Sequence, residues 1–84
     1  LPTIEISESE LRTGINLVEL LGESWAGLCH SNGEARRLIK GGGARVNDEA
    51  IHDEKAKVSN IDITADGVVK LSAGKKRHML IRPV

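Results

Sequence analysis

The sequence of 84 residues has a single cysteine, Cys29, and no long apolar run. One cysteine excludes a disulfide within the chain and a zinc site built from cysteines, and it is typical of a protein from the reducing cytoplasm. No stretch reaches the roughly 18 apolar residues that a membrane span needs, and the first ten residues are too acidic for a signal peptide. We therefore expect a cytoplasmic protein without a membrane partner. The start at Leu1-Pro2, without a methionine, predicts a fragment of a longer protein.

Aromatic residues are almost absent, since Trp25 is the only one. Modules that bind single-stranded RNA commonly stack bases on Phe, Tyr or Trp side chains. If this chain binds RNA, it must therefore recognise phosphates, sugars and helical shape, which points to structured or double-stranded RNA.

The chain has no excess of either charge, because its 12 basic residues balance its 12 acidic residues. The distribution along the chain is uneven. Residues 1–30 hold one basic and five acidic residues, a net charge of −4, whereas residues 31–84 hold 11 basic and 7 acidic residues, a net charge of +4. The basic part contains two clusters: Arg36, Arg37, Lys40 and Arg45 in the first, and Lys75, Lys76 and Arg77 in the second. This asymmetry indicates that the basic part has a polyanionic partner.

Local patterns predict two helices. Asn16 is a favourable N-cap with Glu19 three residues later, and an apolar stripe follows, so a first helix is expected over residues 17–23. The segment from Ser31 to Glu34 is a capping box that opens a second helix. Lys40, followed by three glycines, ends that helix.

Short alternating segments predict strands, which lie at residues 3–6, 44–47, 50–52, 68–71 and 78–81. The last two form a terminal hairpin. Residues 7–13 are expected to be a loop, and three isolated apolar residues are expected to anchor the middle of the chain: Val58, Ile61 and Ile63. We predict an α+β fold with two short helices packed on a small antiparallel sheet.

The length leaves room for one small domain and is too short for a dinucleotide-binding catalytic domain. We expect residues 1–14 to be a linker or a short strand from a preceding domain. Residues 15–84 are expected to form the binding domain.

The predicted second helix has two faces. At about 100° per residue, Arg36, Arg37 and Lys40 surround Gly33, and the apolar residues Ala35, Leu38 and Ile39 fall on the opposite side. A glycine in this position lets a phosphate approach closely, and the free amides of a helix N-terminus favour an anion. Arg45 follows directly and could point to the same side, while Lys75-Lys76-Arg77 could complete a groove. The alternative is an ordinary solvated helix face.

Three patterns that resemble chemical motifs are set aside. Lys70-Leu71-Ser72 matches only the start of the lysine loop of class I aminoacyl-tRNA synthetases, and it lies inside a predicted hairpin. Gly41-Gly42-Gly43 is not followed by the Lys-Ser/Thr that opens a helix in a phosphate loop. Cys29-His30 has no companion cysteine, so we expect Cys29 to be buried near Trp25. We therefore predict no catalytic residue, no metal site and no cofactor.

The motif from Ser31 to Lys40, followed by Gly42-Gly43-Ala44-Arg45-Val46-Asn47, resembles the alpha-L RNA-binding motif. This motif is the two-helix and small-sheet module named for ribosomal small-subunit protein four. More narrowly, the segment from Leu17 to Lys40, together with the ending Lys70 to His78, is similar to the C-terminal domain of bacterial-type tyrosyl-tRNA synthetases. The resemblance extends from Ile15 to Pro83.

The resemblance implies a non-catalytic domain that helps a tyrosine-tRNA ligase bind tyrosine tRNA through its phosphate backbone, near the anticodon stem and the long variable arm. The ATP-binding catalytic core, and the homodimer contact expected of it, would lie outside this chain. The RNA-binding residues that it implies are Ser31, Asn32, Gly33, Arg36, Arg37, Lys40, Arg45, Asn47, Lys75, Lys76 and Arg77. The superfamily often has glycine where this chain has Asp48, which adds a carboxylate beside Asn47.

Three alternatives remain open. The same motif occurs in other hosts, such as pseudouridine synthases and ribosome-associated proteins. The acidic part of the chain could instead dock a basic protein partner. The third alternative is an enzyme that uses Lys70 and Ser72.

Overall fold

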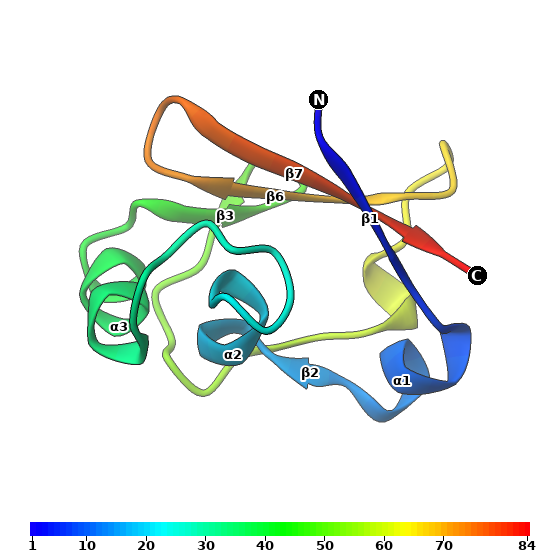
Figure 1. Cartoon of the computed structure of the whole chain (residues 1–84), viewed down its shortest axis with the longest axis horizontal. Coiled ribbons are helices and arrows are strands. Elements are labelled where there is room, and N and C mark those ends of the chain that lie inside the picture. Colours follow the sequence, from blue (N-terminus) through cyan, green and yellow to red (C-terminus); the bar gives the residue numbers. More distant parts are fainter.

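The structure is a computed structural model that describes all 84 residues. Its helices are α1 (Glu8–Thr13), α2 (Leu17–Leu21), α3 (Asn32–Lys40) and the 3-10 helix η1 (Asn60–Asp62). Its strands are β1 (Thr3–Ile6), β2 (Ile15–Asn16), β3 (Ala44–Val46), β4 (Glu49–Ala50), β5 (Lys57–Val58), β6 (Val69–Ala73) and β7 (Arg77–Pro83). Five strands form a sheet in the order β1-β7-β6-β3-β4, and β2 pairs with β5. Helices α1, α2 and α3 lie on one side of the larger sheet (Figure 1). The predicted α+β class is therefore confirmed.

The amino-terminal segment is more ordered than the sequence predicts. The strand expected at residues 3–6 is confirmed as β1, and it pairs in parallel with β7, so the sheet is not purely antiparallel. The loop expected over residues 7–13 is wrong, because this segment forms α1. Ser7 caps that helix by accepting a hydrogen bond from the Glu10 amide, and Leu11 is buried beneath it. The burial of Leu11 stabilises a helix too short to form alone.

The core lies between the sheet and the helices. Alternate residues of β6 point inward, namely Val69, Leu71 and Ala73, and the apolar side chains of α2 pack in the same cluster. Val58 is buried and Ile63 is partly buried against this core, as predicted. Ile61 does not anchor the chain, because it is 85% exposed on η1. None of the helices is long and apolar enough to cross a membrane.

The helix boundaries follow from their caps. Asn16 accepts hydrogen bonds from the Val18 and Glu19 amides, and the predicted first helix is confirmed as α2 but ends at Leu21, before Gly22. Ser31 accepts from the Glu34 amide, and α3 ends at Lys40 as predicted.

A tight turn joins β3 to β4. Asn47 and Asp48 have φ angles of 53° and 68°, the left-handed pair that a two-residue hairpin turn requires. The return strand covers Glu49–Ala50, so it begins and ends earlier than the expected 50–52. The predicted terminal hairpin is confirmed as β6 and β7.

Arg77 ties the β6–β7 hairpin to the N-terminal end of α3. Its Nη1 donates to the Leu28 carbonyl at 2.5 Å and to Glu34 Oε1 at 3.3 Å, and the same Glu34 oxygen accepts from the His30 amide at 3.4 Å. Desolvation raises the pKa of Glu34, but the Arg77 guanidinium and the His30 amide outweigh it, so the pKa lies below its ordinary value. The hairpin, the connection before α3 and α3 itself therefore meet at one ion pair.

This ion pair predicts a defined pH dependence. A lowered carboxyl pKa stabilises the fold above the ordinary value of 4.5, and this contribution is lost as the pH falls through the lowered pKa. Glu34→Gln should therefore reduce the urea midpoint at neutral pH, and the difference from the parent should shrink below pH 4.5. Glu49→Gln, at an exposed glutamate without an ion-pair partner, serves as the control. Parallel stability curves for the parent and Glu34→Gln down to about pH 3 would contradict the role of this pair.

The burial difference between two isoleucines predicts unequal effects of the same substitution. Ile81 is fully buried, whereas Ile61 is 85% exposed. We expect Ile81→Val to lower the free energy of unfolding by about 1 kcal/mol, because it removes a buried methyl group. Ile61→Val should change it by less than about 0.5 kcal/mol. Urea denaturation followed by circular dichroism measures both, and equal losses would argue against this core.

Candidate RNA-binding surface

Helix α3 presents an apolar face to the core and a basic face to solvent. Ala35 and Ile39 are fully buried, and Leu38 packs partly buried against the same cluster. On the other face, three cations are exposed: Arg36, Arg37 and Lys40. The two faces predicted for this helix are therefore confirmed.

Gly33 lies on the basic face, and the fold does not require a glycine there. A Cβ atom at Gly33 would lie 3.7 Å from Arg37 Nη1 and 3.9 Å from Ser31 Oγ, which are ordinary contacts. By contrast, a Cβ atom at Gly43 would lie 2.6 Å from Leu38 Cδ1. The glycine at position 43 is explained by packing, whereas the glycine at position 33 only leaves the helix surface bare.

The first turn of α3 has both used and unused polar groups. The Ser31 hydroxyl accepts from the Glu34 amide at 3.1 Å, so it serves as the cap. The Asn32 side chain is exposed and lines a hollow of about 330 Å³ together with Arg36. The backbone amides of Asn32 and Gly33 precede the first intrahelical donors, so they remain available for an anion.

The predicted cations differ in whether they have a partner. Lys40 lies 3.5 Å from a Glu54 carboxylate oxygen, and Arg77 is paired with Glu34. The others form no ion pair within the chain: Arg36, Arg37, Arg45, Lys75 and Lys76. These five residues, all exposed, are called the free cations below.

The free cations gather at one end of the molecule. Figure 1 shows α3, the loop from α3 to β3 and the β6–β7 turn at the same end of the long axis. A hydrogen bond of 2.8 Å from the Gly74 amide to the Gly43 carbonyl joins the turn to that loop. Arg45 lies between the inward-facing Ala44 and Val46, so it projects from the opposite face of the sheet. Four free cations therefore lie on α3 and the turn, and Arg45 lies across the sheet from α3.

The β6–β7 turn is braced by His78. The His78 Nε2 group donates to the Lys75 carbonyl at 3.2 Å, and its Nδ1 atom shares a hydrogen bond of 2.9 Å with the Ser72 hydroxyl. Because the carbonyl can only accept, the neutral ring carries its proton on Nε2 and accepts from Ser72. Lys75 and Lys76 therefore stand on a fixed turn.

Asn47 is engaged inside the fold. Its Nδ2 donates to the Asp62 carbonyl at 2.6 Å, and its Oδ1 accepts from the Lys70 amide at 3.0 Å. Asp48 pairs with Lys70 Nζ at 3.0 Å, so its carboxylate does not stand free beside Asn47. The side chain of Asn47 holds the turn against η1 and β6, using one of the two Nδ2 hydrogens.

The Lys70-Leu71-Ser72 and Cys29 motifs have structural roles. Lys70 is in an ion pair, Leu71 is fully buried, and the buried Ser72 is bonded to His78. Cys29 is buried in the core as predicted, and burial, aided by the nearby Glu34, raises the pKa of its thiol. A neutral, buried thiol is a poor nucleophile.

Sequence patterns did not reveal which cations form contacts with other groups of the same chain. Arg77 bonds to a carbonyl 49 residues away and to a glutamate 43 residues away, and no local signal marks such contacts. The only available clue was the capping-box position of Glu34, which places its carboxylate near the start of α3.

Comparison with known proteins places the chain in a family. The family model for the tyrosine–tRNA ligase SYY-like C-terminal domain matches residues 1–81. The tyrosine–tRNA ligase of Bartonella quintana (strain Toulouse) is 56% identical over 84 residues, which is 100% of this chain and 20% of that protein. The ligase of Rhizobium meliloti (strain 1021) is 50% identical over the same coverage, and that of Nitrobacter winogradskyi is 54% identical over 83 residues, 99% of this chain and 19% of that protein. The chain spans about a fifth of the length of these relatives, so the catalytic core of a ligase lies outside the matched segment. The chain belongs to the tyrosine–tRNA ligase SYY-like C-terminal domain family.

Proposed function

We propose that this chain is a non-catalytic tRNA-binding domain, which helps a tyrosine–tRNA ligase hold tyrosine tRNA through its phosphate backbone near the anticodon stem and the long variable arm. The observation that supports this most is the group of free cations at one end of a chain whose net charge is zero. A cation that already has an acidic partner in its own chain gains less from a phosphate than a free one does. The relatives' names supply the ligase and its tRNA.

The geometry of α3 suits a phosphate. Arg36 and Arg37 flank the bare surface of Gly33, and the two unused amides at the start of the helix point the same way as its dipole. A phosphate can therefore meet both backbone donors and guanidinium groups. Lys75 and Lys76, on the neighbouring turn, are placed to contact a second stretch of the same backbone.

The way this surface recognises RNA follows from its side chains. Helix α3 and the β6–β7 turn contain no aromatic residue. Recognition therefore rests on phosphates, sugars and the shape of a folded RNA rather than on stacked bases. In this proposal the domain adds binding free energy and orientation, and the reaction takes place in the rest of the ligase.

Salt dependence tests the role of the free cations on α3. Each neutralised phosphate contributes about 0.7–0.9 to the slope of log affinity against log salt. The double variant Arg36→Gln, Arg37→Gln should lower that slope by roughly 1.4–1.8 in titrations of a labelled tyrosine tRNA transcript. Arg12→Gln, Arg82→Gln is the matched control, since both arginines pair with glutamates of their own chain. An unchanged slope in the first double variant, or an equal loss in the control, would refute the proposed site.

Gly33 should have opposite effects on stability and on binding. Gly33→Ala removes backbone freedom from the unfolded chain and fits without a clash, so we expect the free energy of unfolding to rise by about 0.5–1 kcal/mol. The added methyl group occupies the surface where a phosphate would approach, so affinity for tyrosine tRNA should fall. Thermal melts and tRNA titrations on the same sample measure both. A variant that gains stability and binds tRNA as tightly as the parent would show that the RNA does not approach this glycine.

A further inference from the structure

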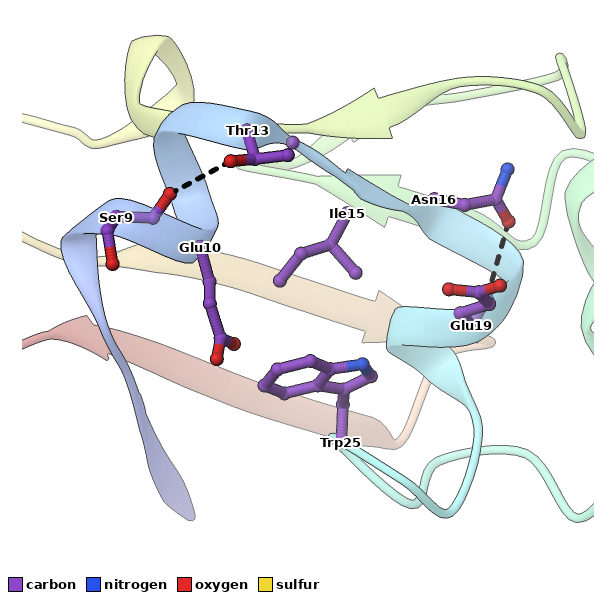
Figure 2. Close-up of a pocket in the computed structure, with 8 residues that line it drawn as sticks. Ser9, Glu10, Thr13, Ile15, Asn16, Glu19 and Trp25 are labelled. Atoms are coloured by element: carbon purple, nitrogen blue, oxygen red, sulfur yellow. Dashed lines mark hydrogen bonds between the residues drawn. The ribbon is translucent and has the colours of Figure 1, made fainter.

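A second surface feature is a cleft of about 440 Å³ between α1 and α2. It is lined by Ser9, Glu10, Thr13, Gly14, Ile15, Asn16, Glu19 and Trp25. Figure 2 shows the carboxylates of Glu10 and Glu19 directed toward the same hollow as the indole ring of Trp25, with Ile15 between them. No free cation lines this cleft.

The two carboxylates are left unused by the fold. Both glutamates occupy the third position of a capped helix, where the carboxylate often bonds back to a cap amide. Asp62 bonds back to the amide of its cap, Ser59, and Glu34 bonds to the amide of His30, one residue before its cap. Glu10 and Glu19 form no such side-chain bond, and they have no ion-pair partner.

The other glutamates of residues 1–30 are paired. Glu5 pairs with Arg82, Glu8 with Arg12, and Glu23 with His30 when that histidine is protonated. The negative charge that remains without a partner in this part of the chain is therefore concentrated in the cleft. The neighbouring polar groups are already engaged, since the Thr13 hydroxyl donates to the Ser9 carbonyl and Asn16 caps α2.

The combination of two free carboxylates with an aromatic ring selects among ligands. A phosphate would be repelled by Glu10 and Glu19, so the cleft does not suit the RNA backbone. A guanidinium group can stack on an indole face and donate in its plane to carboxylates. Charge complementarity thus favours an arginine side chain.

We propose that this cleft docks a basic peptide segment of a protein partner, with an arginine guanidinium stacked on Trp25 and paired with Glu10 and Glu19. The proposal gives a location to the protein-docking role that the charge asymmetry of the sequence left open. It does not rest on RNA binding, because the residues of the cleft and the free cations are different. The two surfaces adjoin, because Glu19 also lines the hollow that contains Arg36.

The composition of the chain makes the test direct, because Trp25 is its only aromatic residue. Trp25 also lines the hollow beside Ser31 and Asn32, so the Glu10 and Glu19 variants are needed to assign an emission change to this cleft. A tetra-arginine peptide should change the Trp25 emission saturably, and a tetra-citrulline peptide, which is neutral and of similar shape, should not. The double variant Glu10→Gln, Glu19→Gln should bind the arginine peptide about tenfold more weakly. Glu49→Gln, at an exposed unpaired glutamate on β4, should leave the peptide affinity unchanged.

Two outcomes would overturn the proposal: equal peptide binding by the parent and the double variant, or an equal response to citrulline. A change in Trp25 emission with an RNA hairpin but not with tetra-arginine would also overturn it. Each substitution removes a negative charge from the first turn of a helix, so the variants should melt slightly below the parent. Each single variant should show an intermediate peptide affinity. Glu10 does not line the hollow that Glu19 shares with Arg36, so tyrosine tRNA affinity should be the same in the parent and in Glu10→Gln. A failure of the RNA proposal and a failure of this one are therefore distinguishable.

Discussion

The arrangement of the basic surface depends on the contact of Arg77 with Glu34 and the Leu28 carbonyl. Two separate elements carry the cations, namely α3 and the β6–β7 turn. The ladder hydrogen bonds of the hairpin do not reach the helix, so they do not hold the two elements together. If the Arg77 contact were absent, the relative position of α3 and the turn would depend only on the core and on the hydrogen bond from the Gly74 amide to the Gly43 carbonyl. Arg77 therefore fixes the turn that carries Lys75 and Lys76 against the start of α3.

The zero net charge of the chain conceals a division between two surfaces. The free cations lie on α3, on the adjacent hairpin turn and on β3, and the unpaired carboxylates of Glu10 and Glu19 line the cleft between α1 and α2. The two surfaces adjoin where Glu19 and Arg36 line the same hollow, and these two side chains form no ion pair. Attraction between exposed charges falls off over a Debye length of about 8 Å, so each surface acts on a partner that comes close to it. Two ion pairs involve α1 and the outer strands, Arg12 with Glu8 and Arg82 with Glu5.

The parts of the fold that follow from local chemistry could be predicted, and the parts that depend on distant partners could not. Asn16, Ser31 and the glycines after Lys40 act on the backbone within a few residues, so the starts of α2 and α3 and the end of α3 were predicted correctly. The helix α1 was missed even though Ser7 and Glu10 stand at capping distance, because its six residues contain only one buried side chain to reveal a period. The parallel pairing of β1 with β7 and the inward bonds of Asn47 join residues far apart in sequence. Which cations are free depends on the same kind of contact, so the sequence could name the basic clusters but could not separate Arg77 from Arg37.

A side chain that the fold does not need is the most informative one about binding. Asn47, Lys70 and Arg77 satisfy backbone groups or carboxylates of their own chain, and Gly43 makes room for Leu38. Gly33 costs helix stability and relieves no clash, and Arg36 and Arg37 beside it satisfy no internal group. Among the acidic residues of positions 1–30, the same criterion selects Glu10 and Glu19, at positions where a carboxylate ordinarily supports a helix cap. Residue type alone does not make this distinction, because arginines and glutamates occur in both groups. It appears only when the internal partners of the charged groups are known.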